Sequence, residues 1–199
     1  MKINEYLKQL KNRPPLTKKQ ILCKIVAALT LVLAIILDVV TKKIVVDNMA
    51  LYEEIPIIKG VFHWKYIQNR GAAFGMLADN REVFLVISSV AIVVMAIYLL
   101  FTRTDRLWWM IGIGMLVGGG IGNMIDRTLL GYVVDFIDFC LINFAIFNVA
   151  DSFVCVGAGM LALWVILDTI REEKAKKAAE AEKAAPETVQ GEHEEKGHE

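Results

Sequence analysis

The sequence predicts an all-α membrane protein with four transmembrane helices, both termini in the cytoplasm and a small β element outside the membrane. Of its 199 residues, 56% are hydrophobic and 22% are charged. The mean hydropathy of +0.48 is too high for an ordinary soluble domain of this size. The 22 basic residues are balanced by 22 acidic residues. Because no basic excess remains for phosphates, a nucleic-acid-binding protein is excluded.

The four spans follow from the lengths of the apolar runs, because a membrane helix needs about 20 mostly apolar residues. The expected spans are residues 25–44, 83–102, 107–125 and 147–168. The second and third contain no charged residue. The first and the fourth reach this length only by including Asp38 and Asp151. The sequence therefore predicts that two carboxylates lie within the membrane.

The orientation follows from the excess of basic residues that cytoplasmic loops carry. Residues 1–24 contain seven Lys and Arg, Arg103 and Arg106 lie between the second and third spans, and a basic cluster follows the fourth span. We therefore expect both termini in the cytoplasm and a four-span domain over residues 21–170. The other segments are a cytoplasmic N-terminal segment (1–20), an outer loop (45–82) and a charged, partly disordered cytoplasmic tail (171–199). Within the outer loop, residues 61–67 alternate like a strand.

The cysteines and histidines exclude several chemistries. Cys23, Cys140 and Cys155 are irregularly spaced, so we expect small buried apolar side chains and neither disulfides nor a thiolate metal site. All three histidines lie outside the expected membrane core, which leaves neither a zinc peptidase motif nor a Ser–His pair. A Ser–Lys peptidase using Ser152 and Lys42 remains a minor alternative.

Four carboxylates are expected at one depth, near the outer membrane face. Asp38 lies roughly 21 Å along the first helix from its cytoplasmic end. Asp126 ends the third span on the same side, Asp151 lies about one turn inside the fourth, and Asp135 lies in the loop between them. Because a charge in hydrocarbon costs a few kcal/mol, such residues usually face a polar cavity and have a function.

Asp135 and Asp151 are the candidate reactive pair. Two adjacent carboxylates cannot both ionise cheaply, so one retains a proton and the pair can act as base and acid on water and an amide. Asp151 could instead be a helix cap, although Asn148 on the same helix face favours a polar site. Spacing alone does not prefer Asp135 to Asp126 or Asp138.

Other polar groups have structural interpretations of comparable or greater weight. Asp38 and Lys42 are spaced i, i+4 and can neutralise each other across one helical turn, which is the stronger interpretation. Asn69 and Gly71 belong to a polar turn that spacing alone leaves unassigned. In the third span, glycines at 114, 118 and 122 form a small-xxx-small stripe that favours close helix packing. Asp126 continues this stripe and is equally compatible with packing and with catalysis.

Five blocks of the chain together resemble the bacterial lipoprotein signal peptidase family, also called signal peptidase II. The blocks are Asp38-Val-Val-Thr-Lys42, Asn69-Arg-Gly-Ala-Ala-Phe-Gly75, Gly122-Asn-Met-Ile-Asp-Arg127, Val133-Val-Asp-Phe136 and Phe147-Asn-Val-Ala-Asp-Ser152. The resemblance implies an aspartic endopeptidase of the bacterial inner membrane, with its active site toward the outer face. It implies cleavage of diacylglyceryl-modified prolipoproteins just before the lipidated cysteine. It further implies an outer β-cradle and a mobile short helix within residues 45–82.

In the family pattern the catalytic pair falls on Asp135 and Asp151. Supporting or substrate-binding positions are Asp38, Lys42, Asn69, Gly71, Asn123, Asp126, Arg127, Asn148 and Ala150. We expect no cofactor, no catalytic metal and no nucleic-acid partner, and we expect a monomer in contact with membrane lipids.

Two other classes of protein remain as alternatives. A proton-coupled transporter would also carry intramembrane carboxylates, but it predicts a polar path near the midplane, often with internal repeats. If the chain were a structural assembly protein, the glycine stripe would be explained by helix packing, but Asp135 and Asp151 would have no function.

Overall fold

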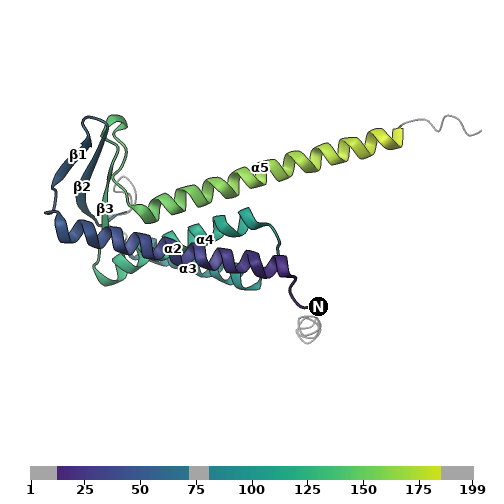
Figure 1. Cartoon of the computed structure of the whole chain (residues 1–199), viewed down its shortest axis with the longest axis horizontal. Helices are drawn as coiled ribbons and strands as arrows, with labels where there is room; N and C mark the ends of the chain where they lie inside the picture. The colour runs from purple at the N-terminus through teal and green to yellow at the C-terminus, as the bar shows by residue number, and fades with distance from the viewer. Residues whose placement is uncertain (1–12, 72–80, 185–199) are drawn as a thin grey trace, which may run out of the picture. The chain divides into compact units, whose positions relative to one another are not determined.

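The computed structural model describes residues 13–71 and 81–184. The order of elements is α2 (Lys18–Asn48), β1 (Glu54–Ile58), β2 (Phe62–Asn69), α3 (Arg81–Phe101), α4 (Leu107–Leu129), β3 (Val133–Asp138), the 3-10 turn η3 (Cys140–Ile142) and α5 (Val149–Ala184) (Figure 1). The chain divides into two compact units, Met1–Ala162 and Leu163–Glu199, and the boundary falls within α5. The first unit contains all the candidate site residues. The described part of the second unit continues α5 as helix.

The first helix begins at a capping box. The Thr17 hydroxyl oxygen accepts a hydrogen bond from the backbone N–H of Gln20 (3.2 Å), and the Gln20 side chain accepts one from the N–H of Thr17 (3.1 Å). These bonds satisfy two backbone donors that a helix N-terminus leaves unpaired. With 31 residues, α2 is about 46 Å long and exceeds the apolar thickness of a bilayer. It therefore extends beyond the expected span 25–44 at both ends.

Within the described residues, three helices are long and apolar enough to cross a membrane: α2, α4 and the segment Val149–Glu180 of α5. In α3, the apolar stretch Val86–Phe101 is shorter. Large apolar side chains are exposed along these helices, including Leu29 (63%) and Leu100 (70%). Apolar surface this extensive is typical of a face that contacts lipid. The protein is thus membrane-embedded, as the composition predicts.

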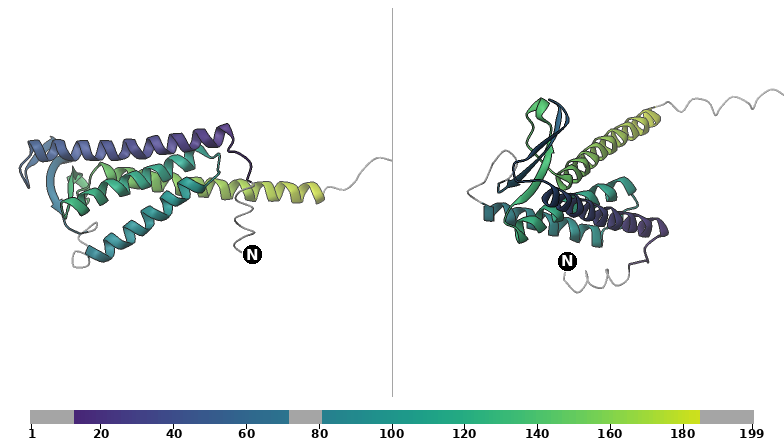
Figure 2. Two further views of the ribbon diagram at one scale, coloured as in Figure 1. Left: turned by 90° about the horizontal axis from the view of Figure 1, so that it is seen from below. Right: turned by 60° about the vertical axis from the view of Figure 1, so that its left-hand side comes forward.

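The glycine stripe of α4 faces α2. Figure 2 shows α2 and α3 running alongside α4, and both helices contact it. A Cβ on Gly114 would lie 2.6 Å from the carbonyl oxygen of Ala27, and one on Gly118 would lie 2.7 Å from that of Leu31. Only glycine permits this approach, so the stripe is a packing seam.

The three strands form one antiparallel sheet in the order β1-β2-β3. A cluster of buried apolar side chains connects it to the end of α2: Val45, Met49, Tyr66, Val134 and Phe136. The strand expected over residues 61–67 is confirmed as β2. The strand β3 was not expected from the sequence, which placed Asp135 in a loop. A short helix is also expected within residues 45–82, and this range includes residues 72–80, which lie outside the described residues.

The expectation of three buried cysteines is wrong for Cys155. Cys23 is buried and Cys140 is partly buried, whereas Cys155 is exposed on α5. A cysteine tolerates an apolar exterior because its thiol is only weakly polar.

Candidate active site

Two carboxylates meet where β3 approaches the start of α5. Asp135 lies within β3 and is 2% exposed. Asp151 lies in the first turn of α5 and is partly buried. A negative charge is favoured in this turn, because the unpaired N–H groups and the helix dipole give a helix N-terminus partial positive charge.

Asn148 connects the two carboxylates. Its side-chain oxygen accepts from the backbone N–H of Asp151 (2.9 Å), and Asp151 Oδ2 accepts from the backbone N–H of Asn148 (3.2 Å). These reciprocal bonds form a capping box at the start of α5. The Asn148 amide Nδ2 donates to Asp135 Oδ1 at 2.7 Å. Asp151 is therefore a capping residue, as the structural interpretation held, and it is also held beside Asp135.

Asp135 is buried, and both of its oxygens accept hydrogen bonds. Asn69 Nδ2 donates to Oδ2 at 2.9 Å, while Asn148 donates to Oδ1. Burial raises the pKa of Asp135 to about 7, and the charge of Asp151 adds to this increase, whereas the two amide hydrogen bonds oppose it. A carboxyl group with a pKa near neutrality can both give and take a proton at physiological pH.

A buried ammonium lies behind the pair. Lys42 is 3% exposed, and its Nζ is 2.8 Å from Asp38 Oδ2, 3.0 Å from Asp126 Oδ2 and 3.0 Å from Asn123 Oδ1. All three N–H donors of the ammonium therefore have an acceptor. Asn123 uses its amide nitrogen to donate to Asp151 Oδ1 at 2.7 Å. The predicted Asp38–Lys42 pair is confirmed. The Lys42 ammonium supplies the positive charge between these oxygens.

Asp38 and Asp126 extend the network to the backbone. Asp38 is fully buried, and its Oδ1 accepts from the N–H of Ala150 at 3.0 Å. Its Oδ2 has the Lys42 ammonium as its one partner among the described residues. Asp126 Oδ2 accepts from the N–H of Val134 at 3.0 Å. The two carboxylates thereby fix the start of α5 and the strand β3.

The structure brings nearly all the sequence-predicted site residues into one network. Gly71 donates its N–H to Asn69 Oδ1 at 3.0 Å, which orders the turn that holds the Asn69 amide. Arg127 donates to the backbone oxygen of Asn123 at 3.3 Å. Asp138 lies three residues beyond Asp135 on β3 and is not part of this network. The backbone N–H of Val134, which donates to Asp126, was not expected from the sequence. The two β-branched residues before Asp135 are typical of a strand and could have indicated β3.

Comparisons with known proteins agree on one family. Residues 30–167 match the family model described as signal peptidase (SPase) II. The lipoprotein signal peptidase of Halothermothrix orenii is 44% identical over 137 residues, covering 69% of this chain and 92% of that protein. The lipoprotein signal peptidase of Clostridioides difficile is 42% identical over 138 residues, covering 69% and 93%. A solved structure described as a bacterial membrane enzyme superposes with a TM-score of 0.67 at 31% identity, covering 72% of this chain and 88% of its own.

Apolar helices of membrane length and these matches define the class of protein, a membrane-embedded peptidase of the aspartic type. The chain belongs to the signal peptidase II family, whose members remove signal peptides. The transporter alternative has no support among these relatives.

Proposed function

We propose that this protein removes the signal peptide from diacylglyceryl-modified prolipoproteins, cutting just before the lipidated cysteine, with Asp135 and Asp151 as the catalytic pair. The observation that carries the assignment of the pair is the Asn148 bridge, which holds a buried carboxyl group beside a more exposed one. The relatives are lipoprotein signal peptidases, which supports lipoproteins as the substrate class.

In the proposed reaction Asp135 enters protonated and Asp151 enters ionised. Asp151 takes a proton from water as the water oxygen bonds to the scissile carbonyl carbon, and Asp135 gives its proton to the carbonyl oxygen. The resulting gem-diol then collapses. Asp151 gives its proton to the leaving nitrogen as the C–N bond breaks, and Asp135 regains a proton from a diol hydroxyl. The pair ends as it began, and the two steps consume one water.

The supporting residues position this pair in the proposed mechanism. Asn123 orients Asp151, Asn69 orients Asp135, and Lys42 keeps the carboxylates behind them neutralised. Arg127 and Ala150 act through the backbone contacts described above. No cofactor takes part in these proton transfers.

The proposed topology has four spans, with α3 as the second, both termini in the cytoplasm and the catalytic pair toward the outer face of the bacterial inner membrane. The basic residues near the cytoplasmic ends support this orientation. In this arrangement the substrate enters laterally from the lipid, and one monomer is sufficient for the reaction. Residues 21–170 form the peptidase domain, and residues 171–199 form a cytoplasmic tail.

A gel-shift assay with purified protein and a diacylglyceryl-modified prolipoprotein tests the proposal. We expect wild type to cut and both Asp135→Asn and Asp151→Asn to lose at least about 100-fold in rate, the contribution typical of one acid–base group. Asp47→Asn is the matched control, since it makes the same change at an exposed carboxylate outside the network.

Two results would contradict the proposal: turnover retained by both the Asp135 and the Asp151 variants, or no cleavage by folded wild type. The pH profile adds an independent criterion. If Asp135 must be protonated, kcat/KM falls as the pH rises through about 7. If kcat/KM instead increases as the pH rises through about 7, Asp135 is the general base and the assigned roles of the two residues are reversed.

A further inference from the structure

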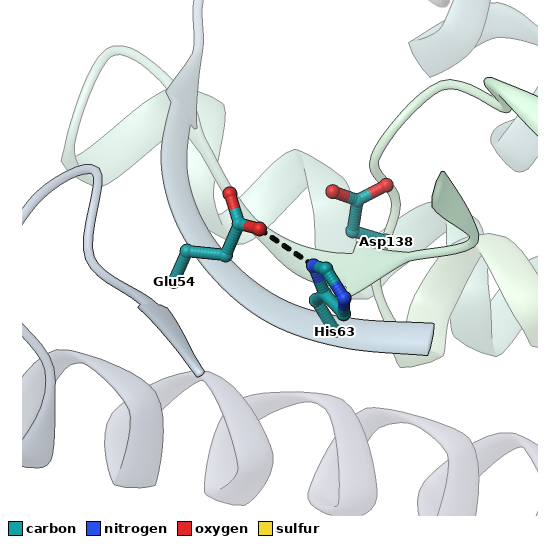
Figure 3. A group of neighbouring side chains, drawn as sticks. All are labelled: Glu54, His63 and Asp138. Carbon is teal, nitrogen blue, oxygen red and sulfur yellow. Dashed lines mark hydrogen bonds and ion pairs between the residues drawn. The ribbon is translucent and has the colours of Figure 1, made fainter. Parts of the chain in front are cut away.

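Three potential metal ligands from three different strands lie together on the sheet, outside the Asp135–Asp151 network. They are Glu54 on β1, His63 on β2 and Asp138 on β3 (Figure 3). One ligand atom of each lies within 4.8 Å of the others. The register places His63 directly opposite Asp138, and Glu54 comes from the neighbouring strand on the other side.

Asp138 is the most buried member of the cluster and has no close partner among the described residues. The residue is 9% exposed, and its carboxylate has no hydrogen bond or close ion pair with residues 13–71 or 81–184. A largely buried carboxylate loses hydration, and the Lys65 ammonium acts on Asp138 only from beyond ion-pair distance. A cation bound beside Asp138 would offset that loss.

The other two residues contact each other, and Glu54 also pairs with Lys65. Glu54 Oε1 is 2.6 Å from His63 Nδ1, and Lys65 Nζ is 3.0 Å from the second oxygen, Oε2. Cys140 Sγ lies 3.6 Å from Nε2, the ring nitrogen of His63 that does not face Glu54, so the thiol is outside this ligand set. Two carboxylates and one ammonium leave the cluster with a net charge of −1 when His63 is neutral.

We propose that Glu54, His63 and Asp138 bind a divalent transition-metal ion of the Zn²⁺ class. One imidazole nitrogen and two carboxylate oxygens are ordinary zinc ligands, at about 2.0 to 2.2 Å from the metal. At such bond lengths the ligand atoms of a tetrahedral ion lie about 3.3 to 3.6 Å apart. The most separated atoms therefore need to approach by up to about 1.5 Å, and the Glu54 and His63 atoms, 2.6 Å apart, need to separate by about 1 Å. The fourth position is left for water.

The ion has a structural role in this proposal. It would connect all three strands, and β3 also carries Asp135 three residues from Asp138. Metal binding at Nδ1 would replace the His63–Glu54 hydrogen bond, and the proton of the neutral imidazole would move to Nε2 in place of the hydrogen bond from the Gly60 N–H. Because the metal competes with protons for its ligand atoms, affinity should increase with pH. The sequence offered no ligand motif because the three residues are distant along the chain and only strand pairing brings them together.

Zinc titration of the full-length, tag-free protein in detergent, after removal of metal with EDTA and dialysis, tests this site. Competition with a chromophoric zinc chelator measures both stoichiometry and affinity. The variants are His63→Gln and Asp138→Asn, each checked for native helical content by circular dichroism. The matched control is the double variant His193→Gln/His198→Gln, since these tail histidines are the only others in the chain and could bind zinc independently.

We expect the control to bind one Zn²⁺ as tightly as the sheet site of wild type. We expect His63→Gln and Asp138→Asn, made in that background, to lose more than about 100-fold in affinity, because removal of a group that merely supports a ligand already costs roughly 10- to 100-fold. Zn²⁺ should raise the melting temperature of the control and leave that of His63→Gln unchanged.

Zinc binding that disappears with the tail histidines would overturn the proposal, as would equal zinc affinity in the control and in both site variants. If Asp138→Asn does not fold, His63→Gln alone decides, because it removes a neutral ligand from a partly exposed position. Peptidase activity is not the readout, so failure of this site leaves the proposed function standing.

Discussion

Replacement of Lys42 by methionine removes the cation at the centre of the buried network while keeping a side chain of similar length. The ammonium contacts Asp38, Asp126 and Asn123 at 2.8 to 3.0 Å. Without it, Asp38 and Asp126 are buried side by side and lose the cation that pairs with both of them among the described residues. Methionine fills the space but cannot donate a hydrogen bond to any of the three oxygens.

The expected loss is large because the pair is desolvated. Lys42 and Asp38 have side chains 4% and 0% exposed, and removing one partner of a buried ion pair costs about 3 to 5 kcal/mol. The adjacent residue provides a matched control. Lys43 pairs with Asp47 at 2.9 Å with the same i, i+4 spacing, but their side chains are 73% and 52% exposed. Such a surface pair contributes about 0 to 1 kcal/mol, so Lys43→Met should have little effect.

The free energy of unfolding, measured by SDS titration in mixed micelles, compares the two variants directly. We expect Lys42→Met to be less stable than Lys43→Met by at least about 2 kcal/mol. Adding Asp38→Asn to Lys42→Met should restore part of the loss, because it removes one uncompensated charge. Equal stabilities of the two single variants, or no recovery in the double variant, would refute this account of the network.

Three further predictions concern proton binding, helix packing and capping. Because burial raises the pKa of Asp135 to about 7, the folded protein binds a proton that the unfolded chain has released above about pH 4. This group's contribution to stability therefore falls by up to about 4 kcal/mol as the pH rises from about 4 to about 7, and the stability difference between wild type and Asp135→Asn should follow that trend in SDS titrations at stepped pH. Gly122→Ala should lower the stability of the fold by about 1 to 3 kcal/mol, since its Cβ would lie 2.5 Å from Asp38 Oδ2. In the control Gly159→Ala the added Cβ meets nothing within 4 Å, so this variant should be neutral or stabilising. Equal melting temperatures of the two variants would contradict this. Thr17→Ala removes one bond of the α2 capping box and should cost about 1 kcal/mol in the same titration, so an unchanged midpoint would count against the cap.

Local spacing predicts one part of the site because helix geometry repeats every 3.6 residues. The i, i+4 spacing of Asp38 and Lys42 predicts their ion pair, which is confirmed. The spacing of three between Asn148 and Asp151 places both on one face of the first turn of α5, where they form the capping box. Each of these contacts depends on one helical turn.

Packing between different elements determines the other part, and spacing along the sequence does not predict it. Asp126, Asp135 and Asp138 are indistinguishable by spacing, yet they have separate environments in the fold. Asp126 pairs with Lys42, Asp135 meets Asn148, and Asp138 lies beside His63. These contacts join different elements: the first depends on the packing of α2 against α4, the second on the approach of β3 to the start of α5, and the third on the register of β2 against β3.

The chain by itself therefore determined the membrane-embedded class, the apolar helices and the polar pairs within single helical turns, since composition and periodicity act over short stretches. Only the tertiary structure decided which carboxylate is desolvated beside Asn148 and which groups gather on the sheet. The pKa of Asp135 depends on the solvent that the whole fold excludes. Burial is a property of packed surfaces from several segments, and no single segment encodes it.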